Sequence, residues 1–296
     1  MSNFLKYITE SNLSLKSNRS IDDLARELLS CLSLFRSNID LGHFELNHEQ
    51  IDVLFANDSF LCKAREVHQW CIDNSIHIVY PCHRFYPNEF RRLAQPPLFL
   101  SVLGNIERLV QPSLSVVGSR EPSSAALDWM ELHLGQFLDL CPEVITVSGG
   151  ARGVDQRTHS LSVRKNRPTI AFLPSGMQFP YPRDLVNWQE KILMTGGCFV
   201  SEFSPFLEVR KHHFEKRNRL IASLSRLLFV VEARRRSGTT LTARLARDLG
   251  TSVCVLPHFP SYAESAGSVD LLFDGAFPIR DANDLSILFS LCRMDS

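Results

Sequence analysis

The chain has 296 residues, enough for one large domain or two ordinary ones with a real hydrophobic core. Hydrophobic residues make up 44% of it and charged residues 22%, as in folded globular proteins. The 32 Lys and Arg residues equal the 32 Asp and Glu residues in number, which excludes nucleic-acid binding through bulk positive charge.

Targeting and cysteine patterns indicate a cytoplasmic protein without a membrane segment. No apolar run reaches the length of a membrane span, and the first 20 residues lack the order of a signal peptide. The eight cysteines are scattered, without a CxxC pair, and most lie in apolar stretches. We therefore expect reduced core thiols, no metal site and no cofactor.

Residues 1–75 have a helical pattern and predict a small helical N-terminal domain. In IDDLARELLSCLSLF (21–35) the apolar residues recur at three-four spacing after Ser20, a candidate N-cap. NHEQIDVLFAN (47–57) and FLCKAREVHQWCIDN (60–74) show the same pattern. Residues 1–60 carry nine acidic and five basic residues, which argues against a nucleic-acid surface there.

Residues 76–296 predict a second domain, of α/β class. Short strands are expected at 76–80 and 98–105, and from residue 113 onward apolar strand candidates alternate with helical segments. These strands are LSVVGS, EVITVSG, PTIAFLPSG, CFVSE, RLLFVVE and SVCVLP. They do not alternate apolar with polar residues, so both of their faces must be buried under helices. We therefore predict a doubly wound, mostly parallel sheet, with its ligand site at the carboxyl ends of the strands.

Two glycine-rich strand ends are candidate anion sites. SVVGSREPSS offers Gly118, Ser119 and Arg120 before a helix that starts near residue 123 or 124. TVSGGARGVDQRTH (146–159) is not the GxGxxG fingerprint, and on its own residues it predicts a phosphate cradle or a structural turn. Its candidate binding residues are Gly149, Gly150 and Arg152. Asp155 is interpreted as a partner of the helix dipole.

The strongest local charge lies in residues 203–250, with eleven basic residues against four acidic ones. HHFEKRNRLIASLS (212–225) is predicted to form a loop that leads into a helix, where an aromatic flanked by cations suits base stacking. A solvated basic face and a core phenylalanine fit the same residues. The candidates are Lys211, Phe214, Arg217 and Asn218. At least one of the adjacent residues 217–219 is expected to brace the fold. His212 and His213 are interpreted as surface polar residues rather than metal ligands.

The fourth strand end, VVEARRRSGTTLTARLA (230–246), ends a strand near Glu232 and starts a helix around residue 237 or 238. Ser237, Gly238 and Thr239 are candidate anion contacts at the start of this helix, although the three arginines alone also fit a solvated loop. Together the four loops predict an extended anion-binding groove.

These residues carry a family resemblance. VVGSREPS, VSGGARGVD, LPSGMQFPYP, FVSEFSP, FEKRNRLIASLS, VVEARRRSGTTLTARLARDLG and GSVDLLFDGA, in this order, resemble the DNA-processing protein A (DprA/Smf) family over residues 76–280. The resemblance implies an extended Rossmann-like fold that binds single-stranded DNA, works as a homodimer and loads the RecA recombinase in natural transformation. It also implies that Arg120, the glycines 149 and 150, Lys211 and Phe214 hold the strand, with Arg217 and Asn218 nearby.

The chain departs from the family in two places. LPHFPSYAESAG has His258 where the family often has glycine after proline, so that loop is expected to differ in shape. About sixteen residues follow the core, so we do not expect the winged-helix-like C-terminal domain of many members. The apolar VDLLFDGAFPI suggests a dimer surface near residues 240–280.

Two other functions remain open. A Rossmann-like phosphoribohydrolase of nucleoside monophosphates carries a PGGxGTxxE signature, but here Thr242 stands at the position of the glutamate. A small-nucleotide sensor fits the same anion-binding loops. Since no nucleophilic triad, Walker motif or metal cluster is found, we expect a binding protein and not an enzyme.

Overall fold

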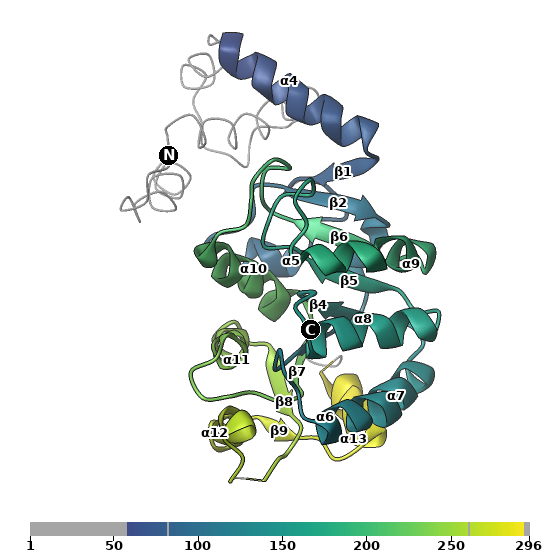
Figure 1. Ribbon diagram of the computed structural model, residues 1–296, viewed down its shortest axis with the longest axis vertical. Helices are drawn as coiled ribbons and strands as arrows, with labels where there is room; N and C mark the ends of the chain where they lie inside the picture. The colour runs from purple at the N-terminus through teal and green to yellow at the C-terminus, as the bar shows by residue number, and fades with distance from the viewer. Residues whose placement is uncertain (1–57, 82, 260, 293–296) are drawn as a thin grey trace.

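The computed structural model describes residues 58–81, 83–259 and 261–292, and Figure 1 shows their arrangement. The helices predicted for residues 21–35 and 47–57 lie outside the described residues. The helix predicted for 60–74 is confirmed as α4 (Asp58–Asp73), where Trp70 packs edge-on against the exposed ring of Phe206, with ring centroids 5.3 Å apart.

One nine-stranded sheet forms the centre of the described part of the chain, in the order β1-β2-β6-β5-β4-β3-β7-β8-β9. β2 runs antiparallel to both neighbours and all other pairs are parallel. The strands are β1 (Ile76–Val79), β2 (Leu100–Gly104), β3 (Ser113–Val117), β4 (Ile145–Ser148), β5 (Thr169–Phe172), β6 (Cys198–Ser201), β7 (Leu227–Val230), β8 (Ser252–Val255) and β9 (Phe277–Pro278). The predicted mostly parallel sheet is therefore confirmed.

Helices cover both faces of the sheet, as the non-alternating strands predict. Besides α4 they are α5 (Asn88–Arg91), α6 (Ser124–Trp129), α7 (Gly135–Leu140), α8 (Val154–Arg164), α9 (Gln189–Met194), α10 (Lys211–Leu224), α11 (Gly238–Asp248), α12 (Ala266–Phe273) and α13 (Ala282–Leu291). α5, α10, α11 and α12 contribute to the core on one face, and α6 to α8 and α13 to the core on the other. The fold is doubly wound, of the Rossmann-like kind.

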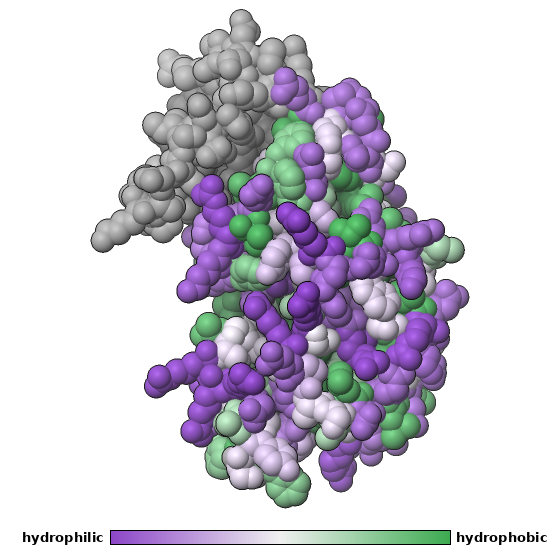
Figure 2. Space-filling model, viewed as in Figure 1, coloured by the Kyte–Doolittle hydropathy of each residue, from purple (hydrophilic) through white to green (hydrophobic). Residues whose placement is uncertain are grey.

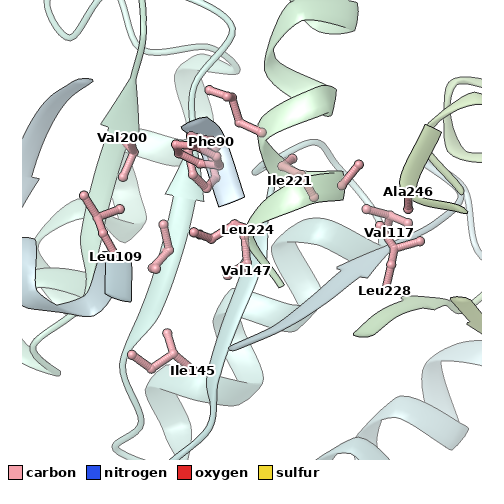
Figure 3. Close-up of a cluster of buried hydrophobic side chains, with 14 of the residues drawn as sticks. Phe90, Leu109, Val117, Ile145, Val147, Val200, Ile221, Leu224, Leu228 and Ala246 are labelled. Atoms are coloured by element: carbon pink, nitrogen blue, oxygen red, sulfur yellow. The ribbon is translucent and has the colours of Figure 1, made fainter. Parts of the chain in front are cut away.

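The core explains where the helices sit. Val117, Val147 and Leu228 of three parallel strands are at most 6% exposed and pack against Ile221 of α10 and Ala246 of α11, as Figure 3 shows. This packing holds α10 and α11 against the same face of the sheet. None of the described helices is both long and apolar enough to span a membrane.

Candidate nucleic-acid interface

A cleft of about 520 Å³ opens at the carboxyl ends of β3 and β7. The chain leaves β3 toward α6 on one face of the sheet and leaves β7 toward α11 on the other, so the cleft lies at the topological switch point. Figure 2 shows hydrophilic side chains gathered at the middle of this face, near α10 and α11. The cleft is lined by Val117, Gly118, Ser119, Arg120, Glu121, Ala151, Asp155, Phe214, Arg217, Asn218, Ile221, Arg234, Ser237, Gly238, Thr239 and Thr242.

The loop after β3 is held by a carboxylate that comes two residues after β7. Glu232 is 1% exposed and accepts hydrogen bonds from the backbone N–H of Ser123 (3.2 and 3.3 Å) and from its hydroxyl (2.6 Å). Ser123 also caps α6, which confirms the predicted helix start. Ser119 Oγ accepts a hydrogen bond from the N–H of Glu121 at 3.1 Å, and Arg120 remains exposed at the rim. The backbone of this loop is therefore fixed, while the side chain of Arg120 is exposed to solvent.

The basic stretch is helical from Lys211 onward, so the loop predicted before a helix is wrong. α10 begins at Lys211 and places Lys211, Phe214 and Asn218 on one face at three-four spacing. The opposite side buries His213 and Arg217, polar residues at positions where a sequence pattern expects apolar ones. Because these two inward-facing residues are polar, the apolar three-four spacing of a helix is absent from the first turns of α10. His213 is also no surface residue, because it is fully buried and stacks on Phe203 with ring centroids 4.4 Å apart.

Phe214 lies among cations and a second aromatic ring. The guanidinium carbons of Arg120 and Arg217 are 5.8 and 6.0 Å from its ring centroid, within cation–π range. Tyr181, from the loop after β5, meets it edge-on with centroids 5.6 Å apart and is 39% exposed. Sequence reasoning did not single out Tyr181. A sequence feature that could have identified it is its place between two prolines in the FPYP stretch, after a buried strand.

Arg217 lies behind the cleft surface. It is 4% exposed, and its Nη1 donates a hydrogen bond to the carbonyl of Phe172 at 3.2 Å. Burial lowers the pKa of Arg217 to about 10, against the opposing charge of Asp155, so the group stays protonated at neutral pH. Burial raises the pKa of Asp155, while Arg217 and the N–H of Ala151 stabilise its charged form. Of the adjacent residues 217–219, both arginines brace the fold, since Arg219 pairs with buried Glu202.

The glycines of the second loop have internal neighbours. A Cβ on Gly149 would lie 1.5 Å from Arg217 Nη1, and one on Gly150 would lie 2.5 Å from a methyl carbon of Leu185. Neither glycine lines the cleft. Gly238 differs, because a Cβ there meets nothing within 4 Å and the residue does line the cleft. Open space for a ligand therefore lies at the start of α11.

The start of α11 offers donors to this space. Ser237 caps the helix by accepting from the N–H of Thr240, and Thr239 Oγ1 donates to the carbonyl of Gly118 at 3.0 Å. The second bond ties α11 to the loop after β3. The first-turn N–H groups of a helix have no intrahelical partner and favour an anion.

Four of the predicted site residues lie outside the cleft lining: Gly149, Gly150, Arg152 and Lys211. Arg152 is 77% exposed in its side chain and pairs with Asp184 at 3.1 Å. Lys211 is exposed one turn before Phe214, at the outer end of α10. The structure therefore brings together Gly118, Ser119, Arg120, Phe214, Arg217, Asn218, Ser237, Gly238 and Thr239.

Thr242, at the position of a hydrolase glutamate, points into its own helix. Its hydroxyl donates to the carbonyl of Gly238 at 2.8 Å. The carboxylates among the cleft-lining residues are exposed Glu121 and buried Asp155, and the latter is held by a backbone N–H. This arrangement favours anion binding over hydrolysis.

The sequence matches the family model described as DNA recombination-mediator protein A over residues 77–290. Protein Smf of Borreliella burgdorferi is 32% identical over 211 residues, which cover 71% of this chain and 66% of that protein. DNA processing protein DprA of Streptococcus pneumoniae is 32% identical over 200 residues, which cover 68% and 70%. The chain spans 57% of the Smf protein of Escherichia coli, to which it is 31% identical over 73% of its own length.

Solved structures of two proteins named DNA processing protein A are among those similar to this one. The crystal structure of DprA from Streptococcus pneumoniae superposes with a TM-score of 0.71 over 96% of this chain and 92% of that one, at 24% identity, and shares the fold. DNA processing protein A from Helicobacter pylori, described for its single-stranded DNA binding mode, superposes with a TM-score of 0.62 at 27% identity. That match covers 71% of this chain and 94% of the other.

Proposed function

This chain belongs to the DNA recombination-mediator protein A family, and from that premise we propose that it binds single-stranded DNA in the cleft at the carboxyl ends of β3 and β7. One observation carries the proposal: Phe214 presents a ring beside two guanidinium groups in a cleft at the switch point. A base stacks on such a ring while cations and helix N–H groups neutralise the phosphates. The Helicobacter pylori relative, described for single-stranded DNA binding, supports the same ligand.

Six of the predicted site residues have a specific role in this proposal. Arg120 and Lys211 neutralise phosphates from the rim, since both are exposed and neither has an ion pair among the described residues. Phe214 supplies the stacking surface, and Gly238 with Thr239 receives a phosphate at the start of α11. Arg217 keeps the cleft wall in place from behind.

The family also supports a proposal for the wider role of the protein. We propose that the protein protects incoming single strands and hands them to the RecA recombinase in the cytoplasm, as part of natural transformation. A homodimer fits the exposed apolar side chains of α12 and β9, where Phe273 is 88% exposed and Phe277 is 50% exposed. RecA loading and the dimer are tested by strand-exchange assays and by light scattering.

The ligand is tested with a labelled oligo-dT and fluorescence anisotropy. Phe214→Ala should weaken binding about tenfold or more, because stacking on an aromatic contributes roughly 1–3 kcal/mol per base. A free nucleoside monophosphate should compete poorly. Equal affinity for the mononucleotide and the oligonucleotide would instead favour the small-nucleotide sensor, which the cleft volume also accommodates.

A further inference from the structure

A second pair of exposed aromatic rings lies at the same edge of the sheet as the cleft. The loop between β8 and α12 carries Phe259 and Tyr262, residues that are 72% and 58% exposed. Their ring centroids are 5.9 Å apart and their planes are inclined by 62°, so the edge-on contact covers little of either ring. Two large rings left side by side in water are typical of a surface that meets a ligand.

Hydrogen bonds hold this aromatic pair at the carboxyl edge. His258 Nε2 donates to the carbonyl of Val231, just beyond the end of β7, at 2.8 Å. The N–H of Tyr262 donates to the carbonyl of Phe259, and the N–H of Ser265 to the carbonyl of Tyr262, both at 3.1 Å. The rings therefore stand on a turned loop that is tied to the strand next to the cleft.

The cleft wall continues up to the aromatic pair. Arg234 lines the cleft, and its guanidinium is 3.7 Å from Glu121 and 3.8 Å from Glu264, which comes two residues after Tyr262. All three side chains are more than half exposed, so these ion pairs are weak and a phosphate can take the place of either carboxylate. Arg236 adds an exposed cation in the same loop, without an ion pair in the part of the chain that the structure describes.

The two aromatic pairs stand at opposite ends of a track. Tyr181 follows β5, whereas Phe259 follows β8, and the strands between them are β4, β3 and β7. Neighbouring strands lie 4.7–4.9 Å apart, so the track is about 19 Å long at the level of the sheet. The cleft begins at Phe214 and lies along the ends of β3 and β7, between the two aromatic pairs. A single strand that crosses this distance spans several nucleotides, in the range of known single-strand site sizes.

We propose that Phe259 and Tyr262 form a second stacking platform, on which a base of the same single-stranded nucleic acid packs after the strand has crossed the cleft. The inference rests on the proposed function and adds a binding subsite to it. Phe214 and Tyr181 hold one end of the bound segment, Arg234 and Arg236 neutralise phosphates between the platforms, and the aromatic pair of the β8–α12 loop holds the other end.

The test is the double variant Phe259→Ala/Tyr262→Ala, assayed with oligo-dT of about 4 and about 16 nucleotides, the limits of typical single-strand sites. The wild type should bind the longer oligonucleotide more tightly. The double variant should lose about tenfold of that affinity and stay within about twofold on the shorter one, which reaches one platform. The matched control is Ile287→Ala/Leu291→Ala, which removes two side chains of α13 that are 61% and 56% exposed.

Unchanged affinity of the double variant at both lengths would overturn the inference. An equal loss of affinity at both lengths would also overturn it, because the rings would then belong to the same binding site as Phe214. Loss of a dimer in light scattering together with loss of affinity would assign the rings to a contact between copies and also overturn it. Phe214→Ala separates the two proposals. If it weakens binding at both lengths the proposed function stands by itself, and if it weakens neither, the proposed function fails.

Discussion

Gly149 has no room for a side chain, because the guanidinium of Arg217 occupies that space. A Cβ would lie 1.5 Å from Arg217 Nη1 and 2.4 Å from its central carbon. Arg217 cannot withdraw freely, since it is buried and bonded to the carbonyl of Phe172. The pair therefore links the loop after β4 to α10, and the position of Phe214 on that helix depends on it.

We predict different outcomes for two glycine substitutions. Gly149→Ala should lower the free energy of unfolding by about 1–3 kcal/mol, because the added methyl group overpacks the site of Arg217. It should also weaken DNA binding, because displacement of Arg217 shifts Phe214 on the same helix. Gly238→Ala should leave stability within about 0.5 kcal/mol, because its Cβ meets nothing within 4 Å. It should still weaken DNA binding, because the methyl group enters the cleft. Urea unfolding and anisotropy measure the two effects, and normal binding by Gly238→Ala would argue against a ligand at α11.

α10 is held to the sheet by an almost buried ion pair. Arg219 and Glu202, which follows β6, are 13% and 7% exposed in their side chains. Within the described structure, Glu202 Oε1 and Arg219 Nε and Nη1 have no hydrogen-bond partner. Burial raises the pKa of Glu202 although Arg219 and Lys216 oppose it. Burying this pair carries a large desolvation free energy, because both charges lose their hydration and only part of their hydrogen bonding is replaced.

Removing one partner of this ion pair should lower the free energy of unfolding more than replacing both partners with apolar residues. Glu202→Gln leaves the Arg219 charge uncompensated and should lower the free energy of unfolding by about 3 kcal/mol. The double variant Glu202→Leu/Arg219→Met should recover most of that loss. Chemical denaturation of the three proteins decides the matter. A double variant no more stable than the single one would show that the ion pair itself stabilises the fold.

At the scale of elements, the sequence predicted the strands and missed the start of α10. Six parallel strands were evident because each is a short, mostly apolar run. α10 was assigned to a loop over its first turns because His213 and Arg217, both buried, occupy its inner face. Their burial depends on partners 39 and 45 residues away, the carbonyls of Pro174 and Phe172. Such long-range hydrogen bonds leave no local pattern.

The whole molecule is a doubly wound sheet whose carboxyl edge gathers loops from distant parts of the chain. The sequence predicted that residues 118–120, 148–150, 217–219 and 237–239 lie at the carboxyl edge of the sheet. The structure has these four segments at that edge. The sequence did not predict that β3 and β7 are neighbours, nor that Gly149 and Gly150 face inward against Arg217 and Leu185. Both depend on strand order, which a pattern of apolar residues does not encode.

The buried polar core of α8 makes stability depend on pH. His159 is fully buried, with Nδ1 2.8 Å from the hydroxyl of Thr169. Burial, with a smaller contribution from the charge of Arg217, lowers the pKa of His159 from 6.5 to about 3. Below pH 6.5 the unfolded chain takes up a proton that the folded protein does not, so stability is lost as the pH falls.

We predict that the free energy of unfolding carries a His159 contribution that falls by about 1.4 kcal/mol per pH unit below pH 6.5. Comparison with His159→Gln isolates it, because other groups, including Asp155 and Glu202, titrate in both proteins. The stability gap between wild type and variant should be constant above pH 7 and should shrink from pH 6.5 to 5. A gap that does not change with pH would mean that His159 has the same pKa in the folded and the unfolded protein.

The central claim, a single-strand track along the carboxyl edge of the sheet, is tested most directly by the salt dependence of oligo-dT binding in the wild type and in Arg120→Gln. The wild type should bind with a steep negative slope of log affinity against log salt, and the variant should reduce that slope by about 0.7, the share of one phosphate contact on a single strand. Affinity insensitive to salt, or a slope unchanged by the variant, would contradict the account.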